Sequence, residues 1–178
     1  MKKLIPTQPR IFILGVTGVI GSGKSVFCKA LQKLGFEWVE ADKFVHQLYV
    51  CGQPGYLKIK EKFGEKFVNS AEVDRKKLRE FILKNPKRIR TLNELIHPLV
   101  VVEVNKKVDQ LVRAGKGKKP ILICIEAVYL DKKNLGKFVD KIITMDAPDD
   151  VILERLQGRG IKKGELLALL KFQRKNIY

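Results

Sequence analysis

The side chains with the clearest chemical use lie in a glycine-rich loop near the start of the chain. Residues 18–25 read GVIGSGKS and match the pattern G-x-x-x-x-G-K-S/T. Glycines at these positions let the backbone curl so that successive N–H groups point inward at phosphate oxygens. Lys24 can reach the β- and γ-phosphates, and Ser25 can bind Mg²⁺. The loop therefore predicts a binding site for a nucleoside triphosphate with Mg²⁺.

Other nucleotide-binding classes fit the sequence less well. A dinucleotide site is disfavoured because Val26 stands where G-x-G-x-x-G requires a small residue. The sequence has no N-K-x-D motif of the kind that reads the base in GTPases. A mechanical or nucleic-acid ATPase is usually longer than 178 residues. At this length, the sequence favours a small-molecule kinase.

Two carboxylates, Asp42 and Glu126, each come at the end of a predicted strand. The carboxyl ends of parallel strands share one crevice, where ligands bind. Asp42 could accept a proton from a substrate hydroxyl and help to hold the metal, or it could be the N-cap of the next helix. Glu126 could orient Mg²⁺ through water or pair with a basic residue. Spacing alone leaves these alternatives open.

Three further side chains have both a functional and a structural interpretation. Arg155 and Arg159 are four residues apart, so they share one face of a helix. Near a nucleotide they would clamp phosphates and stabilise the charge of the transition state, and elsewhere they would form a solvated face. His97 is either a substrate contact or a hydrogen-bonded structural residue.

Alternating strands and helices position these residues. A short apolar run at 11–14 predicts a buried strand, residues 24–34 predict a helix, and residues 36–39 predict a second strand. The apolar face of that helix would carry Val26, Phe27, Ala30, Leu31 and Leu34. A further buried strand is expected at 121–125, and another strand at 141–145. This alternation predicts an α/β fold with a parallel sheet.

The middle of the chain differs, because residues 42–115 follow a helical pattern. Pro98 lies inside this pattern and should distort the helix around it. The segment predicts a helical insertion between strands of the sheet. Pro148 is expected to open a helix at a position where its missing N–H costs nothing, and residues 163–178 are expected to form the last helix.

The net charge of +17 comes from 36 Lys and Arg against 19 Asp and Glu. It suggests either a polyanionic partner or a lysine-rich solvated surface. Cys28, Cys51 and Cys124 form no C-x-x-C pair, which disfavours a zinc site or a disulfide framework and fits a reducing cytosol. The apolar runs are far shorter than the ~20 residues that span a bilayer. Residues 1–10 are interpreted as a loose extension.

Together these residues resemble the dephospho-coenzyme A (dephospho-CoA) kinase family along nearly the whole chain. Residues 15–25 resemble that family's version of the phosphate loop, T-G-x-I-G-S-G-K-S. Ala41-Asp42 resembles the end of its D-A-D motif, with Glu40 in place of the first Asp. Other matches in order and spacing are Phe63-Gly64, Asp74-Arg75 with Leu78, Leu95-Ile96-His97-Pro98, Arg155-Leu156 with Arg159, and Gln173.

The resemblance implies the P-loop NTPase fold of nucleoside monophosphate kinases in a single domain over 11–178. Helices would cover both faces of a parallel core at 11–42 and 116–150. A helical substrate-binding region would occupy 43–115, and a lid with the C-terminal helix would occupy 151–178. The implied reaction is ATP-dependent phosphorylation of the ribose 3′-hydroxyl of dephospho-CoA, with Mg²⁺, in the cytoplasm. No membrane or nucleic-acid partner is expected.

The resemblance also implies roles for individual residues. Asp42 would be the base facing the ribose 3′-hydroxyl, Lys24 and Arg155 would stabilise the moving phosphoryl group, and Arg75 and His97 would lie toward the substrate. The nucleotide would be held by Gly18, Gly21, Ser22, Gly23, Lys24, Ser25, Val26 and Arg159, with Ser25 also binding the metal.

The sequence departs from the family pattern after the strand expected at 121–125. The family often reads D-x-P-L-L-F-E there, whereas residues 126–132 read EAVYLDK, so the exact role of Glu126 stays open. The family usually continues for a strand and a helix beyond the position of Tyr178. Two alternatives remain: another small-molecule kinase, acting on a nucleoside or a shikimate-like alcohol, and an ATP-dependent nucleic-acid-binding module.

Overall fold

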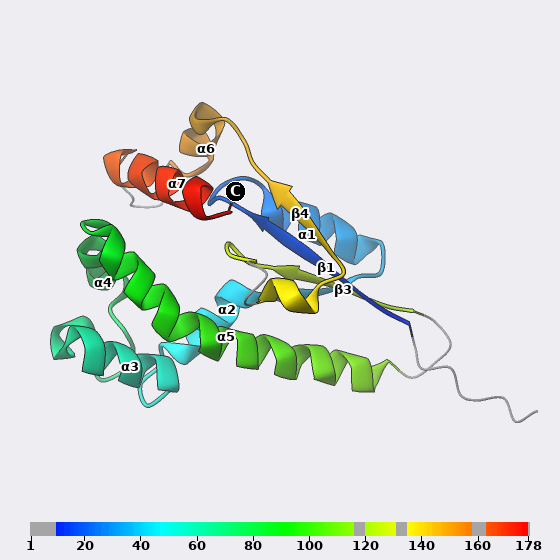
Figure 1. Cartoon of the computed structure of the whole chain (residues 1–178), viewed down its shortest axis with the longest axis horizontal. Coiled ribbons are helices and arrows are strands. Elements are labelled where there is room, and N and C mark those ends of the chain that lie inside the picture. Colours follow the sequence, from blue (N-terminus) through cyan, green and yellow to red (C-terminus); the bar gives the residue numbers. More distant parts are fainter. Residues whose placement is uncertain (1–9, 116–119, 131–134, 158–162, 178) are drawn as a thin grey trace, which may run out of the picture.

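The computed structural model describes residues 10–115, 120–130, 135–157 and 163–177 (Figure 1). Within them, a four-stranded parallel sheet has the order β2-β3-β1-β4. The strands are β1 (Ile11–Gly18), β2 (Glu37–Glu40), β3 (Ile121–Glu126) and β4 (Lys141–Met145). The helices are α1 (Lys24–Lys33), α2 (Ala41–Leu48), α3 (Pro54–Phe63), α4 (Arg75–Leu83), α5 (Pro86–Ala114), α6 (Asp149–Arg155) and α7 (Lys163–Ile177), with 3₁₀ turns at Glu65–Phe67 and Leu135–Phe138. The expected α/β fold with a parallel sheet is confirmed.

The register of the sheet brings the carboxyl ends of three strands to one edge. Val16 of β1 lies opposite Glu126 of β3, and Glu40 of β2 lies opposite the same glutamate. β1 continues to Gly18, beyond the end expected at Leu14, because its glycine-containing second half still pairs with β3 and β4. The glycine loop therefore leaves the sheet beside the ends of β2 and β3.

Side chains of successive strand residues point to opposite faces of the sheet. Val16 and Cys124 lie on one face, where they pack with Cys28 of α1. Ile123 and Ile125 belong to the larger core on the other face, to which α2 and α5 contribute. Helices thus cover both faces, as the resemblance implied, and no described helix is both long and apolar enough to cross a bilayer.

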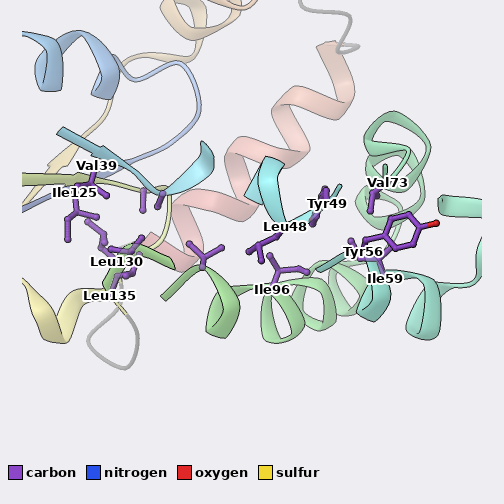
Figure 2. Close-up of a cluster of buried hydrophobic side chains, with 14 of the residues drawn as sticks. Val39, Leu48, Tyr49, Tyr56, Ile59, Val73, Ile96, Ile125, Leu130 and Leu135 are labelled. Carbon is purple, nitrogen blue, oxygen red and sulfur yellow. The ribbon is translucent and has the colours of Figure 1, made fainter. Parts of the chain in front are cut away.

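Helices α2 to α5 form the helical insertion that the sequence predicted. Figure 1 shows α3 and α4 beside the first part of α5, whose later part runs along the sheet. Their buried side chains form one continuous core with those of the sheet (Figure 2). The members of this core labelled in the figure are Val39, Leu48, Tyr49, Tyr56, Ile59, Val73, Ile96, Ile125, Leu130 and Leu135.

Helix α5 passes through Pro98 without ending there. A proline inside a helix removes one backbone hydrogen bond and clashes with the preceding turn. Here Ile96 and Val100 are buried on either side of it, and Pro98 itself is exposed. Burial of the flanking residues holds the helix together, so the distortion expected at this proline does not interrupt the element.

The apolar face expected for α1 is wrong in part. Val26 is 76% exposed, Leu34 is 74% exposed and Ala30 is also exposed, whereas Lys24 and Cys28 are the buried residues of the helix. Residues four apart lie on one helix face, so burying Lys24 at the loop also turns Cys28 toward the sheet. The position of the loop, and not the apolar pattern, sets the rotation of this helix.

Helices α6 and α7 lie next to the glycine loop. Val19 of the loop packs with Ile152 and Leu156 at α6 and with Leu166 and Leu170 of α7. This packing holds the C-terminal helices against the glycine loop.

One boundary near α6 differs from the expectation. Pro148 is the N-cap of α6 rather than its first helical residue, and Asp149 begins the helix. The prediction of a loose extension at residues 1–10 falls almost wholly outside the described residues; Arg10 is exposed.

Candidate active site

The glycine loop connects the end of β1 to the start of α1. Gly21 and Gly23 have positive φ angles of 76° and 99°, which other residues adopt only with strain. Gly18 has φ of 142°, and a Cβ atom there would collide with the backbone carbonyl of Met145. The glycines that the motif predicted are therefore those that the curl of the loop requires.

Lys24 is buried, with 7% of its surface exposed, and its ammonium lies inside the loop. Its Nζ donates hydrogen bonds of 2.9 Å to the carbonyl oxygens of Gly18 and Val19. Burial lowers the pKa of Lys24, while the nearby carboxylates of Asp42 and Glu126 act in the opposite direction. The structure thus holds a cation where the strands bring two carboxylates together.

Ser25 and Glu126 are joined directly. The Ser25 hydroxyl donates to Glu126 Oε1 at 2.7 Å, and the indole Nε1 of Trp38 donates to Glu126 Oε2 at 3.1 Å. Glu126 is 8% exposed, and its burial raises the pKa of its carboxyl, an effect opposed by the Ser25 hydrogen bond and by Lys24. Among the described contacts, the carboxylate of Glu126 is bonded by Ser25 and Trp38 and forms no ion pair with a basic residue.

Two observations bear on whether Mg²⁺ fits here. The Ser22 hydroxyl is buried and has no hydrogen-bond partner among the described residues. The described part of the chain contains no group of three or more His, Cys, Asp and Glu side chains that could hold a metal alone. Mg²⁺ prefers oxygen ligands and commonly takes few from protein and the rest from phosphates and water. The oxygens of Ser25 and Glu126 fit that mode.

Asp42 is in the first turn of α2, but it is not the N-cap, because that position belongs to Glu40. It lines a hollow together with His97 and Tyr129. Part of its surface reaches solvent, yet the surrounding walls raise the pKa of its carboxyl above the ordinary 3.8, and the Lys24 ammonium is the largest opposing influence. The N-cap alternative is therefore wrong, and Asp42 stands beside Lys24.

The other residues expected at the substrate lie in two adjoining hollows. His97 faces the same hollow as Asp42, with its ring centroid 5.6 Å from that of Tyr129. Arg75 lines a neighbouring groove, and Val45 lines both. The structure therefore brings Asp42 and His97 together and places Arg75 next to them rather than among them.

Arg155, at the end of α6, reaches back to the glycine loop. Its Nη1 donates to the carbonyl oxygen of Gly21 at 2.9 Å. Val26 and Arg155 both line the hollow outside the loop. Arg159, the expected partner of Arg155 on one helix face, lies outside the described residues. Helix α6 ends at Arg155. The helix face that Arg155 was expected to share with Arg159 therefore stays a prediction.

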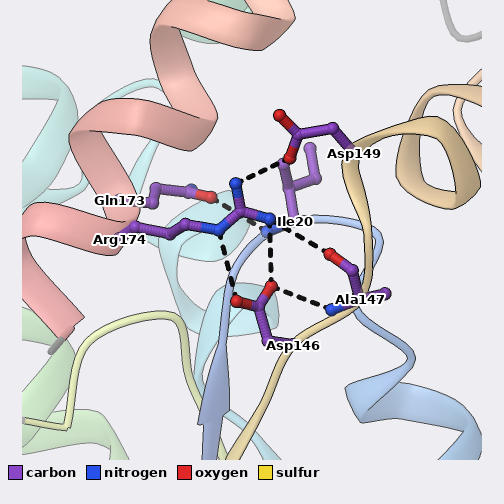
Figure 3. Close-up of polar contacts among 6 residues, drawn as sticks. All are labelled: Ile20, Asp146, Ala147, Asp149, Gln173 and Arg174. Carbon is purple, nitrogen blue, oxygen red and sulfur yellow. Dashed lines mark hydrogen bonds and ion pairs between the residues drawn. The ribbon is translucent and has the colours of Figure 1, made fainter.

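Several residues at this site had no assigned role in the sequence reasoning. Gln173 is 6% exposed, and its Oε1 accepts a 2.9 Å hydrogen bond from the backbone N–H of Ile20 in the loop. Arg174 next to it bonds Asp146, Asp149 and the carbonyl of Ala147 (Figure 3). Gln173 had been noted only as part of a motif.

Sequence reasoning gives Trp38 no place at the site, and it includes Thr17 only as part of the loop motif. The Thr17 hydroxyl donates to the carbonyl of Val128 at 2.7 Å, which ties β1 to the segment after β3. Trp38 contacts Glu126, 88 positions further along the chain. No local pattern signals either contact, because each depends on which strands are neighbours in the sheet.

Comparisons with known proteins agree with one another. A family model described as Dephospho-CoA kinase matches residues 12–176. A protein named Dephospho-CoA kinase from Carboxydothermus hydrogenoformans is 32% identical over 163 residues, which cover 90% of this chain and 77% of that protein. Another of that name from Bacillus licheniformis is also 32% identical, with coverage of 90% and 79%.

Solved structures show the same fold. A protein called TT1252 from Thermus thermophilus superposes with a TM-score of 0.64 at 23% identity, covering 94% of this chain and 86% of that one. The dephospho-CoA kinase from Campylobacter jejuni gives 0.56 at 21% identity, covering 93% and 81%. At such identities the likeness concerns the fold alone.

Proposed function

The chain belongs to the dephospho-CoA kinase family, and we propose that the residues around its glycine loop carry out the family reaction. In that reaction ATP phosphorylates dephospho-CoA, giving coenzyme A and ADP. The resemblance found in the sequence is confirmed by the family match over residues 12–176. Another small-molecule kinase, acting on a nucleoside or a shikimate-like alcohol, is set aside by the same match.

The glycine loop is proposed to hold the phosphates of ATP. The positive φ angles of Gly21 and Gly23 and the unpartnered Ser22 hydroxyl support this, since both leave donors for an anion. Ser25, oriented by Glu126, would hold Mg²⁺. When bound, Mg²⁺ supplies positive charge against the β- and γ-phosphate oxygens. Lys24 would place its ammonium on the same oxygens.

Asp42 is proposed as the base. The observation that carries this is its place beside Lys24, at the carboxyl end of β2, in the hollow that His97 also lines. Its carboxylate would take the proton of the ribose 3′-hydroxyl as that oxygen bonds to the γ-phosphorus. The bond from this phosphorus to the ADP oxygen would break in the same step. A raised pKa suits a base that works near neutral pH.

The helical region, residues 43–115, is proposed to bind dephospho-CoA. His97 would contact the part of the substrate nearest Asp42, and Arg75 in the adjoining groove would contact a more distant anionic part. Residues 151–178 would act as the lid, with Arg155 stabilising the transferred phosphoryl group. The bond of Arg155 to the Gly21 carbonyl supports this, because it keeps the guanidinium within reach of the phosphates.

The setting of the enzyme is also a proposal. The free thiols of Cys28, Cys51 and Cys124 support a reducing cytosol as its compartment. The charge of +17 needs no nucleic-acid partner, since both substrates are polyanions and a basic surface would steer them. Tight RNA binding whose affinity falls steeply with salt would contradict this second point.

The experiment is an assay of ADP release with and without dephospho-CoA, using wild type and Asp42→Asn. We expect the substrate to stimulate release by wild type, and the variant to lose about 10²- to 10⁴-fold in kcat, as removal of a general base does. Asp109→Asn, at an exposed position of α5, is the matched control and should behave as wild type. Absence of stimulation in folded wild type would refute the function. Equal rates for wild type and Asp42→Asn would show that Asp42 is not the base.

A further inference from the structure

Trp38 is the single tryptophan of the chain, and it stands at the edge of the metal site. It lies on β2 opposite Cys124 of β3, and its half-buried ring packs with the core cluster under α1. From there its indole N–H reaches diagonally to the end of β3 and donates to Glu126 Oε2 at 3.1 Å. A side chain placed only to fill the core would not need a donor at this point.

The other oxygen of the Glu126 carboxylate faces Ser25, the proposed metal ligand. Glu126 Oε1 accepts a hydrogen bond from the Ser25 hydroxyl, with 2.7 Å between the two oxygens. The proton of that hydroxyl is thereby turned toward Glu126, and its lone pairs face away from the carboxylate. Trp38 and Ser25 therefore both donate hydrogen bonds to the carboxylate of Glu126. The orientation of Ser25 depends on where Trp38 holds the carboxylate.

The position of the carboxylate has no other direct hydrogen-bonded support among the described side chains than Ser25 and Trp38. A glutamate has one more rotatable bond than the aspartate that stands at this place in the family pattern, so its carboxylate needs more restraint. Glu126 is 8% exposed, so bulk water has little access to its carboxylate. The indole supplies a hydrogen bond to that carboxylate from within the protein.

A neutral donor has a specific advantage here. An arginine or lysine bonded to Glu126 would cancel the negative charge that attracts a divalent cation. An indole N–H fixes the carboxylate and leaves its charge in place. Lys43 lies 6.0 Å from the centre of the Trp38 ring, but it forms its ion pair with Glu40, at 2.6 Å, and not with Glu126.

We propose that Trp38 is a positioning residue for Mg²⁺ binding, acting through Glu126 on the hydroxyl of Ser25. The proposal rests on the metal site put forward above. Residues that orient metal ligands in this way typically change metal affinity by about 10- to 100-fold when removed. Trp38 would therefore set how much Mg²⁺ the enzyme needs, rather than how fast bound substrates react.

The first test is calorimetric binding of ADP at a series of Mg²⁺ concentrations, with wild type, Trp38→Phe and Phe36→Leu. Phenylalanine keeps an aromatic ring and removes the N–H. Phe36 packs in the same cluster as Trp38, so Phe36→Leu controls for a loss of packing. We expect Trp38→Phe to need about tenfold more Mg²⁺ for half-maximal enhancement of ADP binding. Its affinity for ADP without Mg²⁺, and the Mg²⁺ dependence of Phe36→Leu, should match wild type.

The second test uses Trp38 as its own probe, because all tryptophan emission of the chain comes from it. We expect the emission of wild type to change when Mg²⁺ is added in the presence of ADP, and to stay unchanged in Ser25→Ala under the same conditions. This measurement needs no Trp38 variant, so it stands even if Trp38→Phe fails to fold.

The outcomes separate this inference from the function on which it rests. If Mg²⁺ fails to enhance ADP binding by wild type, the proposed metal site and the role of Trp38 are both wrong. If wild type shows the enhancement and Trp38→Phe shows it at the same Mg²⁺ concentration, Trp38 is only a core residue. If the tryptophan emission of wild type does not change when Mg²⁺ is added in the presence of ADP, the same conclusion follows.

Discussion

Replacing Gln173 by leucine should loosen the glycine loop from a helix that lies more than 150 positions away in the sequence. Gln173 Oε1 accepts the backbone N–H of Ile20 at 2.9 Å, and the side chain is 6% exposed. Leucine has nearly the same size but no acceptor. The N–H of Ile20 would then be left without its partner at a partly buried position, where water has little access.

The magnitude follows from that burial. Leaving a buried donor unsatisfied costs about 1–3 kcal/mol, more than the net worth of an exposed hydrogen bond. For a chain of this size, each kcal/mol lowers the melting temperature by roughly 2–4 °C, so the expected loss is about 2–12 °C. The affinity for ADP should fall as well, because the loop that holds its phosphates loses a support.

Thermal denaturation followed by circular dichroism, with and without Mg²⁺ and ADP, measures both effects. Gln157→Leu is the matched control, since Gln157 is exposed just after α6 and no described hydrogen bond uses its side chain. We expect Gln173→Leu to melt lower than the control and to gain less stability from the nucleotide. If the two variants melt at the same temperature, the bond between α7 and the loop contributes nothing.

Three further predictions concern the site and its surroundings. Because desolvation by the surrounding protein raises the pKa of Asp42, the acid limb of the pH profile of kcat/KM should lie above pH 3.8 and disappear in Asp42→Asn. A raised carboxyl pKa makes the ionised group unfavourable for folding, but Asp42 is exposed and the effect is screened by water, so urea denaturation at pH 7 should show the variant about as stable as wild type. Gly18→Ala should cost roughly 1–3 kcal/mol or more in urea denaturation, because its Cβ meets the carbonyl of Met145 at a φ angle of 142°. Arg174→Gln breaks the ion pairs with Asp146 and Asp149, which are partly exposed, so the loss should be about 1 kcal/mol or less and should shrink when the denaturation is repeated at high salt.

The parts of the fold that local patterns encode were predicted well. The strand before the glycine loop and the strands near 121–125 and 141–145 appear because each is a short run rich in apolar residues. The helix after the loop appears because its apolar residues recur at helical spacing. The rotation of α1 was predicted wrongly, with Val26 and Leu34 on the buried face. Its cause is the burial of Lys24, which serves the loop and opposes the apolar pattern.

The site itself was predictable only where a motif carries it. Lys24 and Ser25 follow from the loop, and Asp42 could be placed near them because parallel strands end at one edge. The N-cap alternative for Asp42 failed because β2 continues to Glu40, which takes that position. The contacts of Trp38 and Gln173 depend on the pairing of β2 with β3 and on the docking of α7, which no local pattern contains.

The charges around the loop explain why the metal and the nucleotide should depend on each other. The Lys24 ammonium donates hydrogen bonds to two carbonyl oxygens of its own loop, so the loop binds its own cation. Phosphate oxygens offer stronger, charge-assisted acceptors than these carbonyls. The carboxylates of Asp42 and Glu126, however, lie close enough to affect the pKa of Lys24, and they would repel the same phosphates.

A divalent cation beside Ser25 would reverse that balance, since it would turn the charge of Glu126 from a source of repulsion into an anchor. This is the reason for a neutral partner at Trp38. A cationic side chain in place of Trp38 would cancel the repulsion between Glu126 and the phosphates whether or not Mg²⁺ is bound. An indole N–H instead orients Glu126 and leaves its charge available for Mg²⁺ when the nucleotide binds.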